Sequence, residues 1–252
     1  MRRAERLAAI LDQVAEHGSV EVISLAERFG VSDATVRRDL QSLSRSQMIM
    51  RTHGGAMTAD AGDEVPARVK AVLRRSEKKR IGRAAADLVP DGAVVGMTGG
   101  TTVLELARAL AERRGITVVT NAINVAAELA EHSRGLRLIV IGGIIRHSLE
   151  LVGPAAEAML SNYHLDLAFI GVDGLTPEEG CTTYDEMEAQ TDRAFLRRAQ
   201  RRIVLADSSK IGRITFARIT HLSDINDIIT DDGISAEQCH GLQEAGPRLL
   251  TV

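Results

Sequence analysis

Short apolar runs alternate with helical segments over the C-terminal two-thirds of this chain, and this alternation restricts the fold more than any other feature. The apolar runs are Ala93–Met97, Ile116–Thr120, Leu136–Ile141, Leu167–Val172, Ile203–Ala206 and Ile225–Thr230. The helical stretches between them include Thr102–Arg113, Ala122–Glu131 and Glu188–Arg201. Runs this short and this apolar are typical of buried strands. The pattern therefore predicts an α/β unit with a mostly parallel sheet and helices on its faces.

Composition narrows the class of protein. The chain has 252 residues, of which 44% are apolar and only 2% are aromatic, with no Trp. Its cores must therefore be packed with aliphatic side chains, and recognition of single-stranded nucleic acid by base stacking is disfavoured. No apolar run approaches the roughly 18 residues of a membrane span, and the N-terminus shows no apolar signal segment. We expect a cytoplasmic protein that does not engage a membrane.

The cysteines give no sign of a metal centre. Cys181 and Cys239 are the only two, and neither stands in a CxxC or Cys/His pattern with metal-ligand spacing. Reduced thiols are the ordinary state of such residues in a cytosolic protein. We expect neither a metal site nor a cofactor.

The N-terminal residues show helical periodicity. Apolar residues recur at helical spacing within Arg3–Glu16, and a second short apolar helix ends at Gly30, which suits a tight turn. Ser32 is a good N-cap for a third helix. The apolar side of that helix is formed by Val36, Leu40 and Leu43. These residues predict a helix packed by one face onto the first two.

The opposite face of the third helix is suited to DNA. Arginine can pair with a guanine edge through two hydrogen bonds, and backbone amides at a helix start favour phosphate. A basic hairpin, Met48–Ala56, follows and predicts a wing that contacts phosphate or the minor groove. The helix, glycine turn, helix and basic hairpin predict a winged helix-turn-helix that binds double-stranded operator DNA. The candidate contact residues are Ser32, Ala34, Thr35, Arg37, Arg38, Gln41, Arg51, His53 and Gly54.

Charge leaves an alternative open. The net charge is −3, and residues 1–57 hold eight Arg against seven Asp or Glu, so a DNA contact depends on how charges are arranged. Arg37 and Arg38 could instead be solvated, with polar neighbours on their own helix. Those neighbours are Asp33, Asp39 and Gln41.

Three regions follow from these patterns. We predict a DNA-binding domain over 1–57, a linker over 58–75 and an effector-binding sensor domain over 76–252. Eight Lys or Arg lie between Arg68 and Arg83 against Glu77 alone. This basic run is either a solvated helix face or linker, or an extra phosphate contact.

Polar or glycine-rich loops follow five of the predicted strands. Ligands of parallel sheets bind at the carboxyl ends of strands, where these loops should meet. Glycines, hydroxyls and a helix start favour an anion, and Arg146 and Lys210 add positive charge. The loops predict a pocket for a phosphorylated, hydroxyl-rich small molecule. Its candidate residues are Thr98, Gly99, Gly100, Thr101, Thr102, Asn121, Gly143, Arg146, Asp173 and Lys210.

Two sets of motifs resemble those of the DeoR family of bacterial transcriptional regulators. The first is Val31-Ser32 with Thr35-Val36-Arg37-Arg38-Asp39-Leu40 and Leu43, followed by Arg51-x-His53-Gly54-Gly55-Ala56. The second includes Gly99-Gly100-Thr101-Thr102, Leu151-Val152-Gly153-Pro154, Thr182-Thr183 with Glu186 and Glu188, and Ala206-Asp207-Ser208-Ser209-Lys210. One departure is Thr98, where many members carry Asp.

The resemblance implies a sensor fold similar to that of ribose-phosphate isomerases and coenzyme A transferases. It also implies that a sugar phosphate or related metabolite is the effector and that Glu188 belongs to its site. We expect a homo-oligomer, a dimer or tetramer, that represses a carbohydrate or related metabolic operon. An activator is not separable from a repressor by sequence.

The competing hypothesis is an enzyme, a sugar-phosphate isomerase or acyl transferase with an accessory domain. Asp173, Glu186, Glu188 and Lys210 could supply acid–base chemistry. A metabolic enzyme has little use for a helix that presents Thr35, Arg37 and Arg38, so we expect a regulator and not an enzyme.

Overall fold

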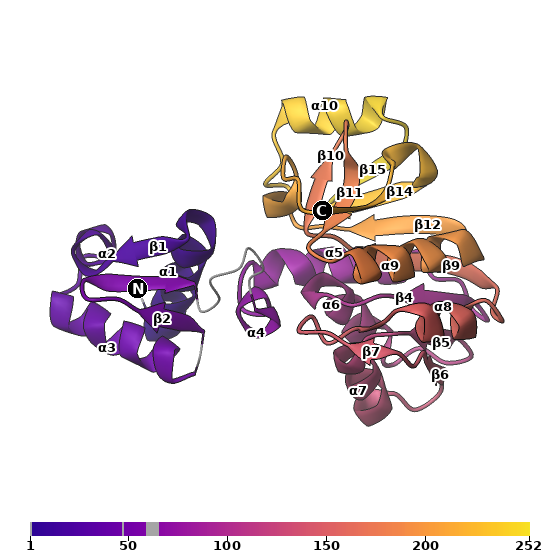
Figure 1. Ribbon diagram of the computed structural model, residues 1–252, viewed down its shortest axis with the longest axis horizontal. Coiled ribbons are helices and arrows are strands. Elements are labelled where there is room, and N and C mark those ends of the chain that lie inside the picture. The colour runs from indigo at the N-terminus through magenta and orange to yellow at the C-terminus, as the bar shows by residue number, and fades with distance from the viewer. Residues whose placement is uncertain (1, 47, 59–65) are drawn as a thin grey trace. The chain divides into compact units, whose positions relative to one another are not determined.

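The computed structural model describes residues 2–46, 48–58 and 66–252, which fall into two compact units, Met1–Leu73 and Arg74–Val252 (Figure 1). The predicted linker, 58–75, falls partly on residues 59–65, which lie outside the described residues. After them, the short helix α4 (Ala67–Lys70) belongs to the first unit, and α5 (Arg75–Asp87) opens the second.

The first unit combines three helices with a small sheet. Its elements are α1 (Arg3–His17), β1 (Ser19–Glu21), α2 (Val22–Phe29), α3 (Asp33–Arg45), β2 (Ile49–Arg51) and β3 (Gly55–Thr58). The strands form an antiparallel sheet in the order β1-β3-β2. The three predicted helices and the hairpin are present, whereas β1 was not expected. With three residues and one half-buried side chain, Val20, β1 is too short for a periodic signal.

The core of this unit explains why α3 is fixed. Val36, Leu40 and Leu43 are buried, as the spacing predicts, and they join the apolar sides of α1 and α2. Ile49 of β2 and Ala56 of β3 close the same core. The hydrophobic contacts therefore hold α3 by one face and leave the other face outward.

A seven-stranded sheet forms the centre of the second unit. Its strands are β4 (Val94–Met97), β5 (Thr117–Thr120), β6 (Arg137–Val140), β9 (Leu165–Gly171), β12 (Ala199–Leu205), β14 (Asp227–Thr230) and β15 (Arg248–Thr251). Their order is β15-β14-β12-β9-β4-β5-β6, and every pairing in this sheet is parallel. The predicted α/β class is confirmed. Six of the seven strands were predicted. The seventh, β15, was not, because Leu249 and Leu250 are its only apolar residues.

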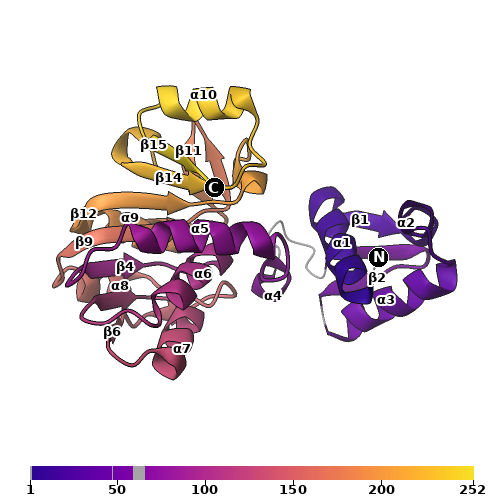
Figure 2. The ribbon, with the colours of Figure 1, turned by 180° about the vertical axis from the view of Figure 1, so that it is seen from behind.

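Helices cover both faces of this sheet. On one face, α5, α6 (Thr101–Leu110) and α7 (Ile123–His132) pack against the strands through side chains such as Ile81, Leu106 and Leu129. On the other face lie α8 (Pro154–Leu160) and α9 (Glu186–Arg198), with Leu160 and Phe195 in the core. Figure 1 views the α8 and α9 side, and Figure 2 views the α5 side.

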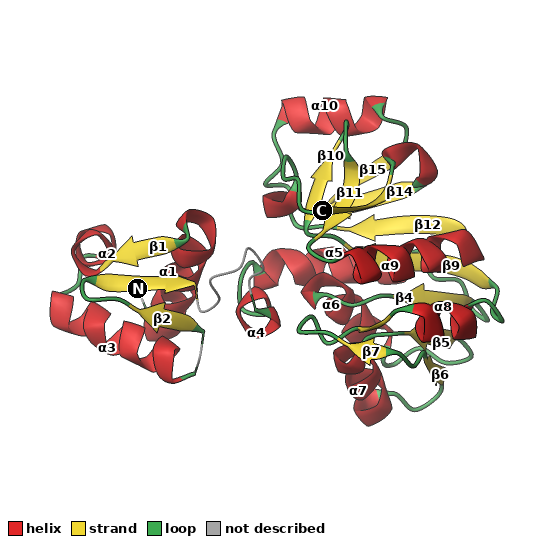
Figure 3. Cartoon of the chain, in the orientation of Figure 1, coloured by secondary structure: helices red, strands yellow, loops and turns green. Residues whose placement is uncertain are grey.

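Smaller elements extend the carboxyl side of the sheet. A hairpin joins β7 (Ile144–Ile145) to β8 (Leu151–Val152), and a second, antiparallel sheet runs in the order β10-β11-β13 (Figure 3). The bounds are β10 (Gly174–Thr176), β11 (Gly180–Thr183), β13 (Ala217–Thr220) and, near the C-terminus, α10 (Ala236–Glu244). These strands are only two to four residues long, which is too short for a distinct sequence signal.

Candidate functional site

The N-terminal half of α3 is held by a side-chain cap. The Ser32 hydroxyl accepts a hydrogen bond from the Thr35 backbone amide at 3.3 Å, and the two hydroxyls lie 3.0 Å apart. The cap satisfies one of the amides that a helix start leaves unpaired, as the sequence predicts for Ser32. It also leaves Thr35 half-buried, whereas Ala34 beside it is exposed.

The outer face of α3 presents unpaired cations. Arg37, Arg38 and Gln41 are exposed, and neither arginine forms an ion pair or hydrogen bond with the described residues. Asp39, one of the polar neighbours considered for these arginines, is only 2% exposed and bonds to Arg6 instead. Two guanidinium groups on a rigid helix, without internal partners, are suited to phosphates and base edges.

Asp39 has a role that sequence reasoning missed. Its carboxylate accepts hydrogen bonds from Arg6 Nε at 2.6 Å and from Arg3 Nε at 3.3 Å. These bonds tie α3 to α1 across the unit. The available signal was an acidic residue close to Val36, Leu40 and Leu43 on the buried face of the third helix. Its partners could not be predicted, because they are far away in the sequence.

The wing lies at the turn between β2 and β3. Arg51, His53 and Gly54 are all exposed, as expected of contact residues. The Gly54 carbonyl accepts a hydrogen bond from the Val22 amide at 2.9 Å, which fixes the turn against the start of α2. Gly55 is required by packing, because a Cβ there would overlap the Val20 carbonyl.

In the second unit, the loop after β4 meets the end of β9. The Thr98 amide donates to the Phe169 carbonyl at 3.1 Å, and the Thr98 hydroxyl accepts from the Gly171 amide at 3.3 Å. Thr98 is therefore buried and engaged with the backbone. Gly100 adopts a φ of 98° just before α6, a conformation that favours glycine. The helix start at Thr101 is suited to an anion.

A second group of predicted residues forms one hydrogen-bonded network. Lys210 Nζ lies 3.2 Å from Asp173 Oδ1, and the Thr183 hydroxyl donates to Glu188 Oε1 at 2.5 Å. Arg146 pairs with Glu188 at 2.5 Å. The Thr183 hydroxyl also lies 3.4 Å from Asp173 Oδ2, so the two ion pairs belong to one network. Thr183 was not among the predicted site residues, although it stands in one of the family-like motifs.

Arg146 and Lys210 are both committed to carboxylates. Arg146 also lies 3.2 Å from Asp185, which caps α9 by accepting from two backbone amides. An anionic ligand that binds these cations must therefore compete with, or add to, existing ion pairs. This differs from the expectation of a cation held ready for phosphate.

Asp207 is a buried carboxylate beside several cations. Burial alone would raise the pKa of Asp207, but Lys78, Lys210, Ser209 and Arg74 together hold it below its ordinary value. Lys78 is only 4% exposed and lies 3.9 Å from Asp207. The basic run between Arg68 and Arg83 is thus not uniformly solvated, because this lysine is directed into the sensor unit.

Asp192 of α9 is buried close to Glu188 and Asp173 of the hydrogen-bonded network. Burial raises the pKa of Asp192 well above its ordinary value, and the nearby Glu188 and Asp173 add to the rise. Buried carboxylates close to one another cannot all ionise cheaply. No sequence pattern marked Asp192, because it stands one turn beyond Glu188 without a motif of its own.

Asn121 and Gly143 position the β7–β8 hairpin. Asn121 Nδ2 donates to the Leu151 carbonyl at 3.1 Å, and the Leu151 amide returns a bond to the Asn121 carbonyl at 2.8 Å. A Cβ at Gly143 would lie 2.7 Å from the Val152 carbonyl oxygen. Both residues thus hold the hairpin that carries Arg146 and Glu150, and the second of these was not predicted.

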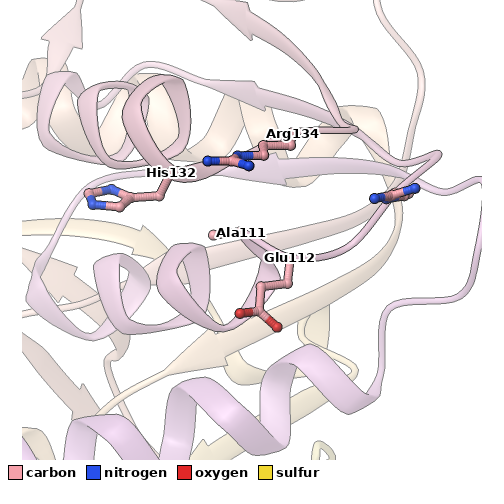
Figure 4. Close-up of a pocket in the computed structure, with 5 residues that line it drawn as sticks. Ala111, Glu112, His132 and Arg134 are labelled. Atoms are coloured by element: carbon pink, nitrogen blue, oxygen red, sulfur yellow. The ribbon is translucent and has the colours of Figure 1, made fainter.

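A separate cavity of about 240 Å³ lies near the amino ends of the strands, opposite the ends that carry the predicted site (Figure 4). It is lined by Ala111, Glu112, Arg114, His132 and Arg134. These residues precede β5 and β6, at the amino ends of the strands. None of the predicted effector residues lines this cavity, so it is not the site to which the loops point.

Among residues 2–46, 48–58 and 66–252, no group of His, Cys, Asp or Glu is arranged to hold a metal ion. Within the same ranges, no helix has the length and apolarity that crossing a membrane requires.

Comparison with known proteins gives matches in both units. Residues 6–61 match the DeoR-like helix-turn-helix domain, and residues 73–232 match the DeoR C-terminal sensor domain. A protein described as an aga operon transcriptional repressor from Escherichia coli O157:H7 is 36% identical over 253 residues, 99% of this chain and 94% of the relative. The glycerol-3-phosphate regulon repressor of Escherichia coli strain K12 is 30% identical over 232 residues, 92% of each chain.

A similarity to solved structures accompanies these relatives. The full-length sorbitol operon regulator SorC from Klebsiella pneumoniae is 12% identical, with a TM-score of 0.42 over 96% of this chain and 99% of that one.

Proposed function

Because the chain belongs to the DeoR family of transcriptional regulators, we propose that it represses a carbohydrate or related metabolic operon and is released by a phosphorylated small molecule. The observation that carries the proposal is the pair Arg37 and Arg38, which are exposed and have no ion pair within the described part of the chain, on a capped helix of a winged helix-turn-helix unit. Relatives named as repressors of the aga operon and the glycerol-3-phosphate regulon favour repression. Since its partner is DNA, we place the protein in the cytoplasm.

The DNA-binding step follows from the geometry of α3 and the wing. The outer face of α3 enters the major groove, where Thr35, Arg37 and Gln41 meet base edges. Arg38, Arg51 and the backbone at Gly54 contact phosphates, and His53 lies at the tip of the wing. Phosphate contacts set the position, and base contacts set the sequence preference.

Control by an effector requires a site that differs between two states of the protein. We assign the effector to the carboxyl edge of the sheet, over the Thr98–Thr102 loop and the network around Asp173 and Lys210. A ligand shifts an equilibrium only by its difference in affinity for the two states. The ion pairs of Lys210 and Arg146 are suited to this, because an incoming phosphate rearranges both.

A homo-oligomer is part of the proposal. Operators read by helix-turn-helix proteins contain repeated half-sites, and a symmetric dimer or tetramer presents two reading heads to them. An effector that changes the spacing of the heads lowers affinity for the operator without touching α3.

The enzyme alternative is not supported. The relatives are named as transcriptional regulators, and the helix-turn-helix match covers residues 6–61. Of the groups that could act as acid and base, Lys210 and Asp173 form an ion pair with each other, and Glu188 pairs with Arg146.

The test uses the full-length protein and a duplex from the control region of its own operon. Anisotropy titrations should give an affinity that falls steeply with salt, because contacts to phosphates release counterions. A member of a panel of phosphorylated metabolites should then dissociate the complex. A flat salt response contradicts DNA recognition through phosphates, and a complex that persists with every metabolite contradicts the effector class.

A matched variant separates the two units. Lys210→Ala should bind the duplex like wild type but resist release by the metabolite, since the effector loses a cationic partner. Arg248→Ala, an exposed arginine on β15, serves as the control. A Lys210→Ala protein that responds like wild type removes this residue from the effector site.

A further inference from the structure

Glu150 places a buried carboxylate against the glycine-threonine loop. It follows the turn of the β7–β8 hairpin and is only 5% exposed. A Cβ on Gly99 would overlap the Glu150 carboxylate and lie 2.5 Å from Cδ. The glycine at position 99 therefore makes room for this side chain.

The hairpin holds Glu150 in place by its backbone. The Glu150 carbonyl accepts from the Arg146 amide at 2.9 Å, and Glu150 forms an isolated bridge with Ala122. The preceding Leu149 has a φ of 67°, in a left-handed region that L side chains seldom adopt. Its carbonyl accepts from the Ile123 amide at 2.9 Å. Unusual backbone conformations of this kind concentrate at ligand sites.

The two predicted carboxylates of the site are held in ion pairs. Asp173 is paired with Lys210 and Glu188 with Arg146. The Thr98 hydroxyl is engaged by the Gly171 amide, so position 98 offers no acceptor comparable to a carboxylate. Glu150 lies directly against the loop at which α6 begins, because a Cβ on Gly99 would overlap its carboxylate.

We propose that Glu150 determines effector specificity by accepting a hydrogen bond from a hydroxyl or amino group of the effector, and that Gly99 is required to admit its carboxylate. This inference rests on the proposed function, which puts an effector on the Thr98–Thr102 loop. The helix start favours the anionic group of that effector, and the adjacent carboxylate favours a hydrogen-bond donor beside it. A phosphorylated polyol or sugar, or its amino counterpart, carries a donor on its carbon skeleton beside the phosphate, whereas inorganic phosphate has no group outside the anion itself.

Titration calorimetry on the full-length protein tests this. The probes are a panel of sugar phosphates, each with its amino-sugar counterpart, and inorganic phosphate. For the sugar phosphate that binds wild type, Glu150→Gln and Gly99→Ala should each weaken binding at least tenfold, and affinity for inorganic phosphate should stay within twofold. Glu131→Gln, on the exposed C-terminal turn of α7, should match wild type throughout. A larger loss for the amino sugar identifies an ammonium donor, and an equal or larger loss for the sugar identifies a hydroxyl donor.

The contrary results are distinct. Glu150→Gln that binds the sugar phosphate within twofold of wild type overturns this inference and leaves the proposed function standing. If Glu150→Gln loses affinity for sugar phosphate and for inorganic phosphate equally, the inference is also overturned, because Glu150 would then only shape the loop. Failure of every sugar phosphate to bind wild type overturns both the inference and the proposed effector. If Gly99→Ala does not fold, Glu150→Gln alone decides.

Discussion

Asp39 of the recognition helix and Arg6 of the first helix form a buried ion pair, with 2.6 Å between the carboxylate and Nε. Asp39 is 2% exposed and Arg6 is 8% exposed. Because a lone charge in such a place is costly, each residue depends on the other. The pair fixes the angle at which α3 leaves the core, and so the direction in which Arg37 and Arg38 point.

Replacing Asp39 tests this pair. Asp39→Asn should destabilise the first unit by about 3 kcal/mol, because Arg6 is left buried without its counter-charge. It should also weaken operator binding, although Asp39 does not face the DNA. Calorimetric unfolding and anisotropy measure the two effects. Glu27→Gln, an exposed acidic residue on α2, is the control; equal stability of the two variants would refute the role of the pair.

Arginines on the outer face should affect binding alone. Arg37→Ala should weaken operator affinity by about 1–3 kcal/mol and relax preference at one base pair if Arg37 contacts a base edge. Arg38→Ala should weaken binding to all duplexes similarly and lower the salt slope by about 1. Neither change should alter the melting temperature, since both side chains are exposed. Unchanged affinity in either variant removes that arginine from the interface.

Two adjacent glycines in the wing offer a matched comparison. Gly55→Ala should destabilise the first unit by about 1–3 kcal/mol, because its Cβ would overlap Val20 backbone that cannot move aside easily. Gly54→Ala should change stability little, since nothing lies within 4 Å of a Cβ there. Hydrogen exchange of the β1–β3 amides measures the difference, and similar protection in both variants would contradict the packing argument.

The raised pKa of Asp192 predicts a pH-dependent effect. The folded protein favours protonated Asp192 because burial raises its pKa, with Glu188 and Asp173 contributing. Its contribution to stability is therefore complete below the unfolded pKa of about 3.9 and is lost as pH rises through the folded pKa. Asp192→Asn cannot ionise, so its stability relative to wild type should increase as pH rises. Urea unfolding at pH 5 and pH 8 checks the sign, and a difference that shrinks between them would contradict it.

Much of the framework was predictable because it depends on neighbours in the sequence. Val36, Leu40 and Leu43 mark the buried side of α3, and Ser32 marks its start. The apolar runs predict the parallel strands, and parallel connection alone brings their carboxyl ends to one edge. For that reason the glycine-threonine loop and Asp173 could be predicted to lie at the same ends of the strands without coordinates.

The amino-acid sequence by itself determined the three N-terminal helices, six strands of the parallel sheet, the division into two units, and which ends of the strands carry the polar loops. Only the tertiary structure decided which charged side chains pair with each other. Asp39 meets Arg6, 33 residues away, and Lys210 meets Asp173, 37 residues away. Glu150 reaches Gly99 only through the hairpin. Periodicity and capping act over a few residues and leave a local pattern, whereas a charge paired across the fold depends on packing that no local window contains.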